Sequence, residues 1–279
     1  MSIPVFNLFS VDGSDGFRLD GEHASDRLGT SVSSAGDVNG DGFDDVIIGA
    51  PLADANAEDD GSSYVVFGKA GGFDATLSLS ALDGSNGFRL DGGHGKYTYG
   101  DSVTGVGDIN GDGFDDVMVK GSGDDYVVFG RSSGFDAQMD LTTLDGSNGF
   151  RLKREKSLEA DHTYLGIGGA DVNGDGFDDA IVQTFYLDQN NHVVRSGHVV
   201  FGHAGGFDAT IDLSTLDGES GFRLMDLQNP GELTVTGSSD INGDGLDDLL
   251  VTTDSTYTIP YGGGGGEVNN YVVYGKTSG

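Results

Sequence analysis

The chain has no cysteine, and this absence removes several kinds of chemistry at once. It excludes disulfides, thiolate metal sites and cysteine nucleophiles. Basic residues are also scarce: 14 Lys and Arg stand against 46 Asp and Glu, which gives a formal net charge of −32. Nucleic acids and anionic membranes bind proteins through basic patches, so we expect neither as a partner.

Long apolar runs are missing as well. No run reaches the length of about 18 apolar residues that a membrane span needs, so no membrane insertion is expected. Met1–Ser10 contains neither a basic segment nor a long apolar core, so no signal peptide is visible. The chain has 4 prolines and 50 glycines, and helical periodicity is hard to find. Short β-branched and aromatic runs between Gly, Asp, Asn and Ser clusters predict an all-β protein.

One acidic stretch of nine residues is present in four nearly identical copies. The copies start at residues 37, 108, 171 and 240, and each reads D-x-N-x-D-G-[FL]-D-D. Oxygen-bearing side chains at positions 1, 3, 5 and 9 suit a hard divalent cation, and the glycine at position 6 permits the turn that brings in the carbonyl at position 7. We therefore predict four Ca²⁺ sites. Four acidic surface hairpins would be the alternative, but it leaves the register of the oxygens unexplained.

The predicted ligands are four side chains and one backbone carbonyl in each loop. They are Asp37, Asn39, Asp41 and Asp45 with the carbonyl of Phe43; Asp108, Asn110, Asp112 and Asp116 with Phe114; Asp171, Asn173, Asp175 and Asp179 with Phe177; and Asp240, Asn242, Asp244 and Asp248 with Leu246. We expect these ions to be structural, because catalysis needs an open coordination position beside a base or nucleophile.

The residues around each loop refine this prediction. An EF-hand carries a glutamate at position 12 and lies between helices. Here position 12 is Ile or Val and a strand-like run follows, so each loop is expected to join two strands of a hairpin. Neighbouring side chains diverge in extended backbone, so the acids at position 8 are expected to point away from their own loops. These acids are Asp44, Asp115, Asp178 and Asp247.

Three further signatures repeat with the loop: D-G-x-x-G-F-R-L, [YH]-V-V-[FY]-G and G-F-D-A. The loops are spaced by 71, 63 and 69 residues, and each repeat reads as four short strands. Repeats of this kind predict the blades of a propeller. We interpret residues 1–279 as a single β-propeller domain of four blades, each with four antiparallel strands. The repeats are approximately 22–90, 91–152, 153–224 and 225–279 plus 1–21.

The strand pattern is offset at the two ends of the chain. The last repeat stops after its third strand, Tyr271–Gly275, and the chain starts with an unpartnered fourth strand, Gly16–Asp20. We expect this N-terminal strand to join the C-terminal blade and close a ring within a monomer, which protects the strand edges. Two chains that form one eight-bladed ring are the alternative.

The pattern resembles the FG-GAP repeats of integrin α-subunit propellers and of many bacterial exported proteins. The first repeat carries the resemblance best, with Leu28-Gly29-Thr-Ser-Val before the loop and Gly49-Ala50-Pro51 after it. The resemblance implies a calcium-binding, integrin-like propeller of the bacterial exported type, outside the cell or on its surface. Integrin propellers have seven blades, however, and this chain has four repeats.

We expect a non-enzymatic module for adhesion or ligand binding. Similar blades with dissimilar connections between strands two and three suggest a protein or glycan ligand on the loop face opposite the calcium loops. Those connections are predicted at Pro51–Ser63, Lys120–Asp125, Thr184–Gly197 and Thr253–Asn270. The candidates for ligand contact in these connections are Tyr186, Asp188, Asn190, Asn191, His192, Tyr257 and Tyr261, and the alternative is that the connections are unconstrained insertions.

Two other functions stay open. One is a purely structural module of a large surface protein, and the other is a carbohydrate-active or other hydrolase with an acidic cleft. The 6 histidines show no metal-ligand spacing and no G-x-S-x-G is present, so the sequence favours no enzyme. The arginines repeated in the fourth strands are expected to pair with aspartates of their own blades. They are Arg18, Arg89, Arg151 and Arg223.

Overall fold

The computed structural model describes residues 7–54, 60–93, 99–121, 123–132, 134–154, 166–187, 193–226, 232–237, 239–254 and 268–277. Within these ranges the regular structure is β-strand, apart from four 3-10 helices of three residues each. No helix in this part of the chain has the length and apolar character needed to cross a membrane. The predicted all-β class is therefore confirmed.

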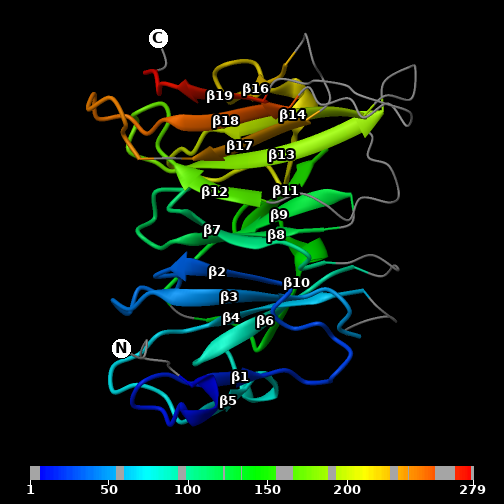
Figure 1. The fold of residues 1–279 in the computed structure, drawn as a ribbon, viewed down its shortest axis with the longest axis vertical. Coiled ribbons are helices and arrows are strands. Elements are labelled where there is room, and N and C mark those ends of the chain that lie inside the picture. The colour runs from blue at the N-terminus through cyan, green and yellow to red at the C-terminus, as the bar shows by residue number, and fades with distance from the viewer. Residues whose placement is uncertain are drawn as a thin grey trace, which may run out of the picture.

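The strands form several small sheets that follow the repeats along the chain (Figure 1). Blade one contains β2 (Ser31–Gly36), β3 (Asp45–Ala50), β4 (Ser62–Val66) and β6 (Gly87–Asp91). Blade two contains β7 (Val103–Gly107), β8 (Asp116–Lys120), β9 (Asp124–Val128) and β11 (Gly149–Lys153). Blade three contains β12 (Gly166–Ala170), β13 (Asp179–Leu187), β14 (Val193–Val200) and β16 (Gly221–Leu224). Blade four contains β17 (Glu232–Gly237), β18 (Leu249–Asp254) and β19 (Val268–Val273).

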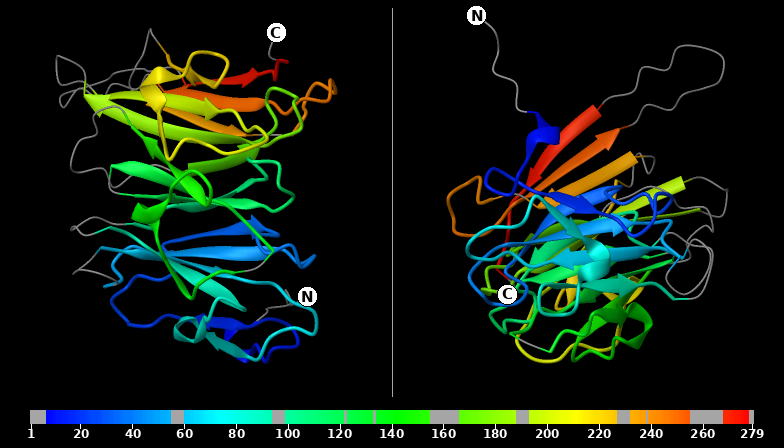
Figure 2. Two further views of the ribbon diagram at one scale, coloured as in Figure 1. Left: turned by 180° about the vertical axis from the view of Figure 1, so that it is seen from behind. Right: turned by 90° about the horizontal axis from the view of Figure 1, so that it is seen from below.

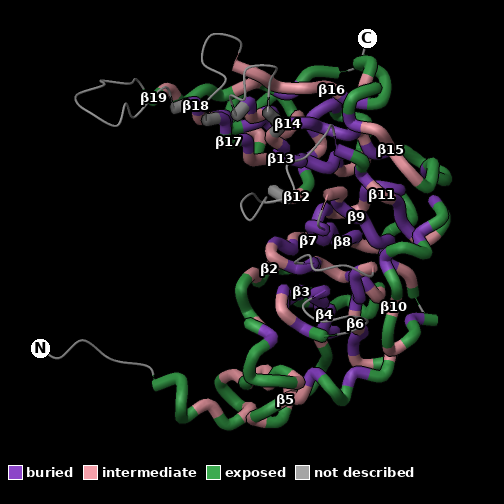
Figure 3. The backbone as a smooth tube through the Cα atoms, turned by 90° about the vertical axis from the view of Figure 1, so that its right-hand side faces the viewer, coloured by how far each residue is buried: buried purple, intermediate pink, exposed green. Residues whose placement is uncertain are grey.

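The middle strands of blades one to three are buried on both faces along most of their length. Tyr64, Val65 and Val66 of β4 are all at most 2% exposed, and the tube in Figure 3 shows the buried segments in the middle of the stack. A strand that is covered on both sides needs a continuous apolar run instead of alternation. This explains the repeated Tyr-Val-Val-Phe pattern, whose side chains pack alternately on the preceding and the following blade.

The first strands of neighbouring blades lie against each other along the stack: β2 contacts β7, β7 contacts β12 and β12 contacts β17. A Cβ atom on Gly169 would lie 1.8 Å from the carbonyl oxygen of Val106, and one on Gly105 would lie 2.8 Å from that of Ser34. The first strands are thus crowded, and only glycine fits at these contacts.

The structure adds one strand to the predicted blade. Three short strands follow the G-F-D-A signature: β5 (Thr76–Ser78), β10 (Gln138–Asp140) and β15 (Thr210–Asp212). Each pairs in parallel with the fourth strand of the preceding blade, so that β10 joins β6 and β15 joins β11. The prediction of four strictly antiparallel strands was therefore incomplete, because each repeat also extends the sheet of its predecessor.

The predicted pairing of the two chain ends is not formed in this structure. β1 (Arg18–Asp20) pairs in parallel with β5, and among the described strands β19 pairs only with β18. The two strands lie at opposite ends of the stack (Figures 1 and 2). β1 is held there because Leu19 and Leu77 of the β1–β5 sheet pack against the apolar cluster of blade one. The described sheets therefore follow one another in a stack, with β1 and β5 at one end and β17, β18 and β19 at the other.

The hairpin of blade three is longer than predicted. β13 and β14 pair continuously from Ala180 opposite Val200 to Leu187 opposite Val193. Most of the connection predicted at 184–197 is therefore strand, and Tyr186 belongs to β13. The other residues expected to contact a ligand lie outside the described ranges. They are Asp188, Asn190, Asn191, His192, Tyr257 and Tyr261.

The close contact between blades one and two predicts the effect of a single methyl group. A Cβ atom on Gly49 of β3 would lie 1.9 Å from the carbonyl oxygen of Gly100. We expect Gly49→Ala to lower the free energy of unfolding by about 1–3 kcal/mol through overpacking. The matched control is Gly206→Ala, whose new Cβ would meet its nearest neighbour at 4.0 Å. Urea denaturation measures both variants, and equal effects would contradict the packing described here.

Candidate metal centres in the repeated loops

Each acidic loop joins the first and second strands of its blade, as predicted. In blade one β2 ends at Gly36 and β3 begins at Asp45. The antiparallel pairing of these strands makes the loop a hairpin connection. All four loops lie along the same side of the stack, at the left in Figure 1. The connections between strands two and three leave the sheets at the opposite edge, since the strands alternate in direction.

Positions 1, 3 and 5 come together around a tight turn. The carboxylate of Asp37 accepts hydrogen bonds from the amides of Asp41 (3.0 Å) and Gly42 (2.9 Å). The side-chain oxygen of Asn39 accepts from the Asp41 amide at 2.9 Å, and its nitrogen donates to the Asp41 carboxylate at 3.1 Å. The same bonds recur in the other loops at 2.8–3.1 Å. The four loops therefore share one conformation.

The closing aspartate at position 9 is the most buried polar residue of each loop. Asp45 is 1% exposed. One of its oxygens accepts from the Val38 amide at 2.9 Å, and the other accepts from the Gly68 amide at 2.8 Å. Its three counterparts are 0% exposed and accept the same pair of amides. They are Asp116, Asp179 and Asp248.

Burial also raises the pKa of the closing carboxyls in the first three loops. It raises the pKa of Asp45 to about 7, although the two amide donors oppose the shift. The negative charges of Asp41 and Asp37 raise that pKa further. The pKa values of Asp116 and Asp179 rise to about 8 and about 7 for the same reasons. A buried carboxylate beside two others is an environment that a cation would stabilise.

The glycine that ends the [YH]-V-V-[FY]-G signature has a role that the sequence analysis missed. Gly68 follows the third strand, and its amide supplies one of the two donors to Asp45. A Cβ atom on Gly68 would lie 2.4 Å from the carbonyl oxygen of Asp44. A side chain is therefore excluded at the point where the third strand meets the loop. The only signal for this role in the sequence was the repetition of the glycine.

The acids at position 8 bind the preceding loop. The Asp115 carboxylate accepts from the backbone amide of Asp37 in the loop before it, at 2.7 Å. Asp178 does the same for Asp108 at 2.9 Å, and Asp247 for Asp171 at 3.2 Å. These side chains point toward another repeat. The sequence analysis expected them to point away from their own loops but did not predict their partners. Asp44 belongs to the first loop, so this chain offers it no preceding loop.

The loops fit a calcium ion by their chemistry. Each carries three carboxylates and one side-chain amide oxygen within nine residues of sequence, and hard cations such as Ca²⁺ prefer such all-oxygen donors. Within the described ranges, no three acidic or histidine side chains are gathered closely enough to form a metal site. The loop carboxylates are instead directed at backbone amides, each of which uses one lone pair of an oxygen. The ligand roles, including those of the carbonyls of Phe43, Phe114, Phe177 and Leu246, stay predictions.

Three of the four repeated arginines lie close to an aspartate. Arg18 contacts Asp20 at 2.6 Å, and Arg89 contacts Asp91 at 2.7 Å. The counterpart in blade two, Arg151, lies 3.6 Å from Asp124, and the one in blade three, Arg223, lies opposite His198 in the strand register. The pairs in the first two cases are two residues apart on one strand, which supports the expected structural role.

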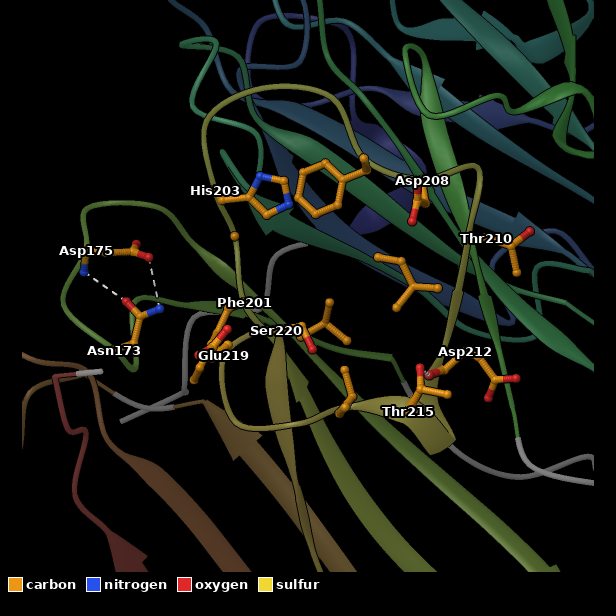
Figure 4. A pocket seen from close by; sticks show the side chains of 15 residues that line it. Asn173, Asp175, Phe201, His203, Asp208, Thr210, Asp212, Thr215, Glu219 and Ser220 are labelled. Atoms are coloured by element: carbon orange, nitrogen blue, oxygen red, sulfur yellow. Dashed lines mark hydrogen bonds between the residues drawn. The ribbon is translucent and has the colours of Figure 1, made fainter. Parts of the chain in front are cut away.

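An acidic pocket at blade three gives no support to a hydrolase. Figure 4 shows Asp175 on one side of this pocket and Asp208 and Asp212 on the other. Asp212 is bound to Lys153 at 2.7 Å and accepts from the Ser214 amide at 3.0 Å. The lysine, followed by this serine, lowers the pKa of Asp212 to about 2. A general acid needs the opposite shift, and Asp175 belongs to the third loop.

The bond between consecutive loops predicts the effect of one substitution. Asp115→Ala removes the acceptor for the Asp37 amide, so we expect the free energy of unfolding to fall by about 1–2 kcal/mol in calcium-free, dilute protein. Asp44→Ala is the matched control, because it occupies the same loop position without a preceding loop. Denaturation in urea compares the two. Similar losses in both variants would show that the bond between repeats is not the cause.

Comparisons with known proteins agree with the repeats. Residues 28–66 match the family model of the FG-GAP repeat. The chain is 39% identical to integrin alpha pat-2 of Caenorhabditis elegans over 94 residues, which covers 33% of this chain and 7% of that protein. It is 32% identical to integrin alpha-2 of Mus musculus over 106 residues, with coverages of 38% and 8%. It is 27% identical to integrin alpha-5 of Xenopus laevis over 187 residues, with coverages of 62% and 16%.

These similarities concern part of each relative. The chain spans between 7% and 16% of the length of these three integrins. It therefore has an FG-GAP repeat and is similar in sequence to the α subunits of integrins, and its small sheets are consistent with propeller blades. These three relatives are animal proteins, so the bacterial exported type stays a prediction.

Proposed function

We propose that this chain is a non-enzymatic ligand-binding module of the FG-GAP propeller type, stabilised by Ca²⁺ in its four loops. The observation that carries the proposal is the single hydrogen-bond pattern shared by all four loops, each closed by a fully buried aspartate. A catalytic centre is normally present once, whereas this arrangement recurs in every blade. The similarity to integrin α subunits supports an adhesion-type module.

The ion would supply charge compensation and rigidity. In the first loop Asp37, Asn39, Asp41 and Asp45 would hold it together with the carbonyl of Phe43. Each ion would offset two of the negative charges that now repel one another within a loop. Four ions would change the formal charge from −32 to −32 + 8 = −24. Because each loop also contacts the next blade, the ions would stiffen the stack as a whole.

The ligand would bind at the ends of the strands opposite the acidic loops, where strands two and three are connected. There the connections between strands two and three differ in length: the strands of the blade-two hairpin end at Lys120 and resume at Asp124, whereas those of blade three extend to Leu187 and resume at Val193. Variable connections on a rigid scaffold are a common way to build a binding site. We propose a protein or glycan ligand there, and a location outside the cell or on its surface in a bacterial exported protein.

Calcium binding is tested by titration of the stripped protein. We expect four ions per chain by calorimetry, and a melting temperature that falls by many degrees on chelation, because a ligand present at about 100 times its Kd stabilises the folded state by about 2.7 kcal/mol per site. Asp41→Ala removes a central oxygen donor and should leave three ions. Asp44→Ala should keep four, since its carboxylate is assigned no ligand role. Equal losses of calcium in the two variants would show that the ligand register is wrong. A stripped chain that binds no calcium would refute the calcium sites.

Ligand binding is tested with the calcium-loaded chain on arrays of glycans and of extracellular proteins. We expect a signal that disappears when residues 188–192 are replaced by the two-residue turn Asn-Gly, which keeps the β13–β14 hairpin. The matched control places Gln138→Lys on the outer strand β10. A signal that survives the loop replacement would contradict the proposed face. Absence of any signal in the presence of four bound ions would favour the purely structural module.

A further inference from the structure

The contact between consecutive blades recurs three times with the same bonds. Between blades one and two, the Arg131 amide donates to the Val38 carbonyl at 2.9 Å, and the Asp115 amide donates to the Asp37 carbonyl at 3.2 Å. The corresponding amide of His203 donates to Ile109 at 3.0 Å, and that of Lys276 donates to Val172 at 2.9 Å. We call these bonds, together with the apolar side chains around them, the inter-blade seam. Each seam has a forward half on the earlier blade and a rear half on the later one.

Blade four presents a forward half that no described residue covers. In blade one the forward apolar residues are Val38, Ile47 and Val65, and each is 0% exposed. The residues at the same three positions of blade four are far more accessible. They are Ile241 at 54%, Leu250 at 39% and Val272 at 42%. The same apolar pattern is thus buried within the stack and exposed at its C-terminal end.

Blade one presents the matching rear half. On the rear of blade two, Val103 is 4% exposed and Val117 is 0% exposed, because both pack on blade one. The same positions in blade one are Val32 at 68% and Val46 at 38%. Phe43 is also 43% exposed.

The loop residues of the two end faces are complementary as well. The ring of Phe114 lies over Gly40 of the preceding loop, where a Cβ atom would approach it to 2.2 Å. Phe43 is the counterpart of Phe114, and Gly243 of the fourth loop is the counterpart of Gly40. A Cβ atom on Gly243 would meet nothing within 4 Å. No described residue therefore occupies the space that Phe43 would fill at the far end of the stack.

The strand edges match in the same way. In blades one to three the third strand pairs antiparallel with the fourth, as β4 does with β6. Among the described strands, β19 is a third strand without a fourth, and β1 is a fourth strand without a third. Phe67 and Phe88 cluster with Phe135 at ring distances of 4.5–5.8 Å. The β1–β5 region contains only the counterparts of Phe88 and Phe135. They are Phe17 and Phe73, whose ring centroids lie 4.0 Å apart.

The missing aromatic ring of that triplet is found at the other end of the chain. The counterpart of Phe67 in blade four is Tyr274, which is 60% exposed. The forward half of blade four and the rear half of blade one are therefore complementary in four respects: their strand edges, apolar residues, loop contacts and aromatic rings. These surfaces face away from each other at opposite ends of one chain (Figure 1), so a second chain can meet each of them without any change in the stacking of the blades.

We propose that a second copy of this chain binds head to tail, with blade four of one copy seated on blade one of the next. β1 then pairs antiparallel with β19 of the neighbour, with Arg18 opposite Tyr271 and Phe17 opposite Val272. This register copies that of Arg89 opposite Tyr64 and Phe88 opposite Val65 within blade one. Such a heterologous contact closes into a ring when the rotation permits, and otherwise continues as a filament. Each copy carries a high negative charge, so association should strengthen as salt screens the repulsion between copies.

The first experiment is sedimentation of the calcium-loaded chain at physiological salt, from about 1 to 200 μM. We expect association that increases with concentration. Val272→Lys and Val32→Lys, which place a charge in the forward and rear halves, should each raise the Kd at least about tenfold. Both residues are exposed in the single chain, so folding is preserved. The matched control is Gln138→Lys on the outer strand β10, which should associate like the unmodified chain.

Mixing the two variants separates this geometry from others. Val272→Lys keeps an intact rear half and Val32→Lys keeps an intact forward half, so an equimolar mixture should form one-to-one dimers. Failure of the mixture to associate would overturn the head-to-tail arrangement, and so would association that neither lysine weakens. An unmodified chain that stays monomeric up to about 200 μM would overturn the proposal as well.

A second experiment tests the strand register, using the absence of native cysteine. Arg18→Cys and Tyr271→Cys are combined in one chain, at positions that are exposed in the single copy. Oxidation should give disulfide-linked dimers or longer species on a non-reducing gel. A monomer with an internal disulfide would overturn the proposal in favour of a ring closed within one chain. A lack of any disulfide would overturn the proposed β1–β19 register.

Discussion

The structure depends on one buried carboxylate in each repeat. Asp45 lies at the junction of the loop and two strands, and it accepts one amide from the loop and one from the end of the third strand. Burying a carboxylate is costly unless its oxygens are satisfied. Two convergent amides meet that requirement only when the loop, β3 and β4 hold their observed positions. The aspartate therefore couples the conformation of the loop to the assembly of the sheet.

That coupling explains why the loop is the most faithfully repeated part of the chain. The Gly-Ala-Pro element of the first repeat is replaced in the later ones, whereas the positions of the Asp and Asn residues are unchanged. A change at the first, third or fifth position would disturb the turn, and a change at the ninth would leave two amides without an acceptor. Each of the first three loops also supplies a backbone group that the next blade binds. Errors in one loop would thus reach two blades.

The sequence predicted those parts of the structure that depend on local patterns. The hairpin character of the loops and the order of the four main strands both follow from turn residues and apolar runs within one repeat. What the sequence analysis missed depends on contacts between repeats. The parallel pairing of β10 with β6, the bond from Asp115 to Asp37 and the position of β1 involve residues separated by about 50 to 80 positions. Repetition of G-F-D-A and of the Asp at position 8 marked these residues as important but did not identify their partners.

The bond from each loop to its successor also gives the chain a direction. The amide of Asp37 can form its hydrogen bond only after residue 115 has been synthesised and positioned. The amide of Asp108 depends on residue 178 in the same way. On a ribosome, which releases the chain from its N-terminus, every loop is therefore synthesised one repeat before the side chain that completes it. In a row of units with nearest-neighbour interactions, the last unit made is the least supported. Each repeat would then fold completely only after the following repeat has been synthesised. The most recently synthesised hairpin would always be the least stable part of the growing chain.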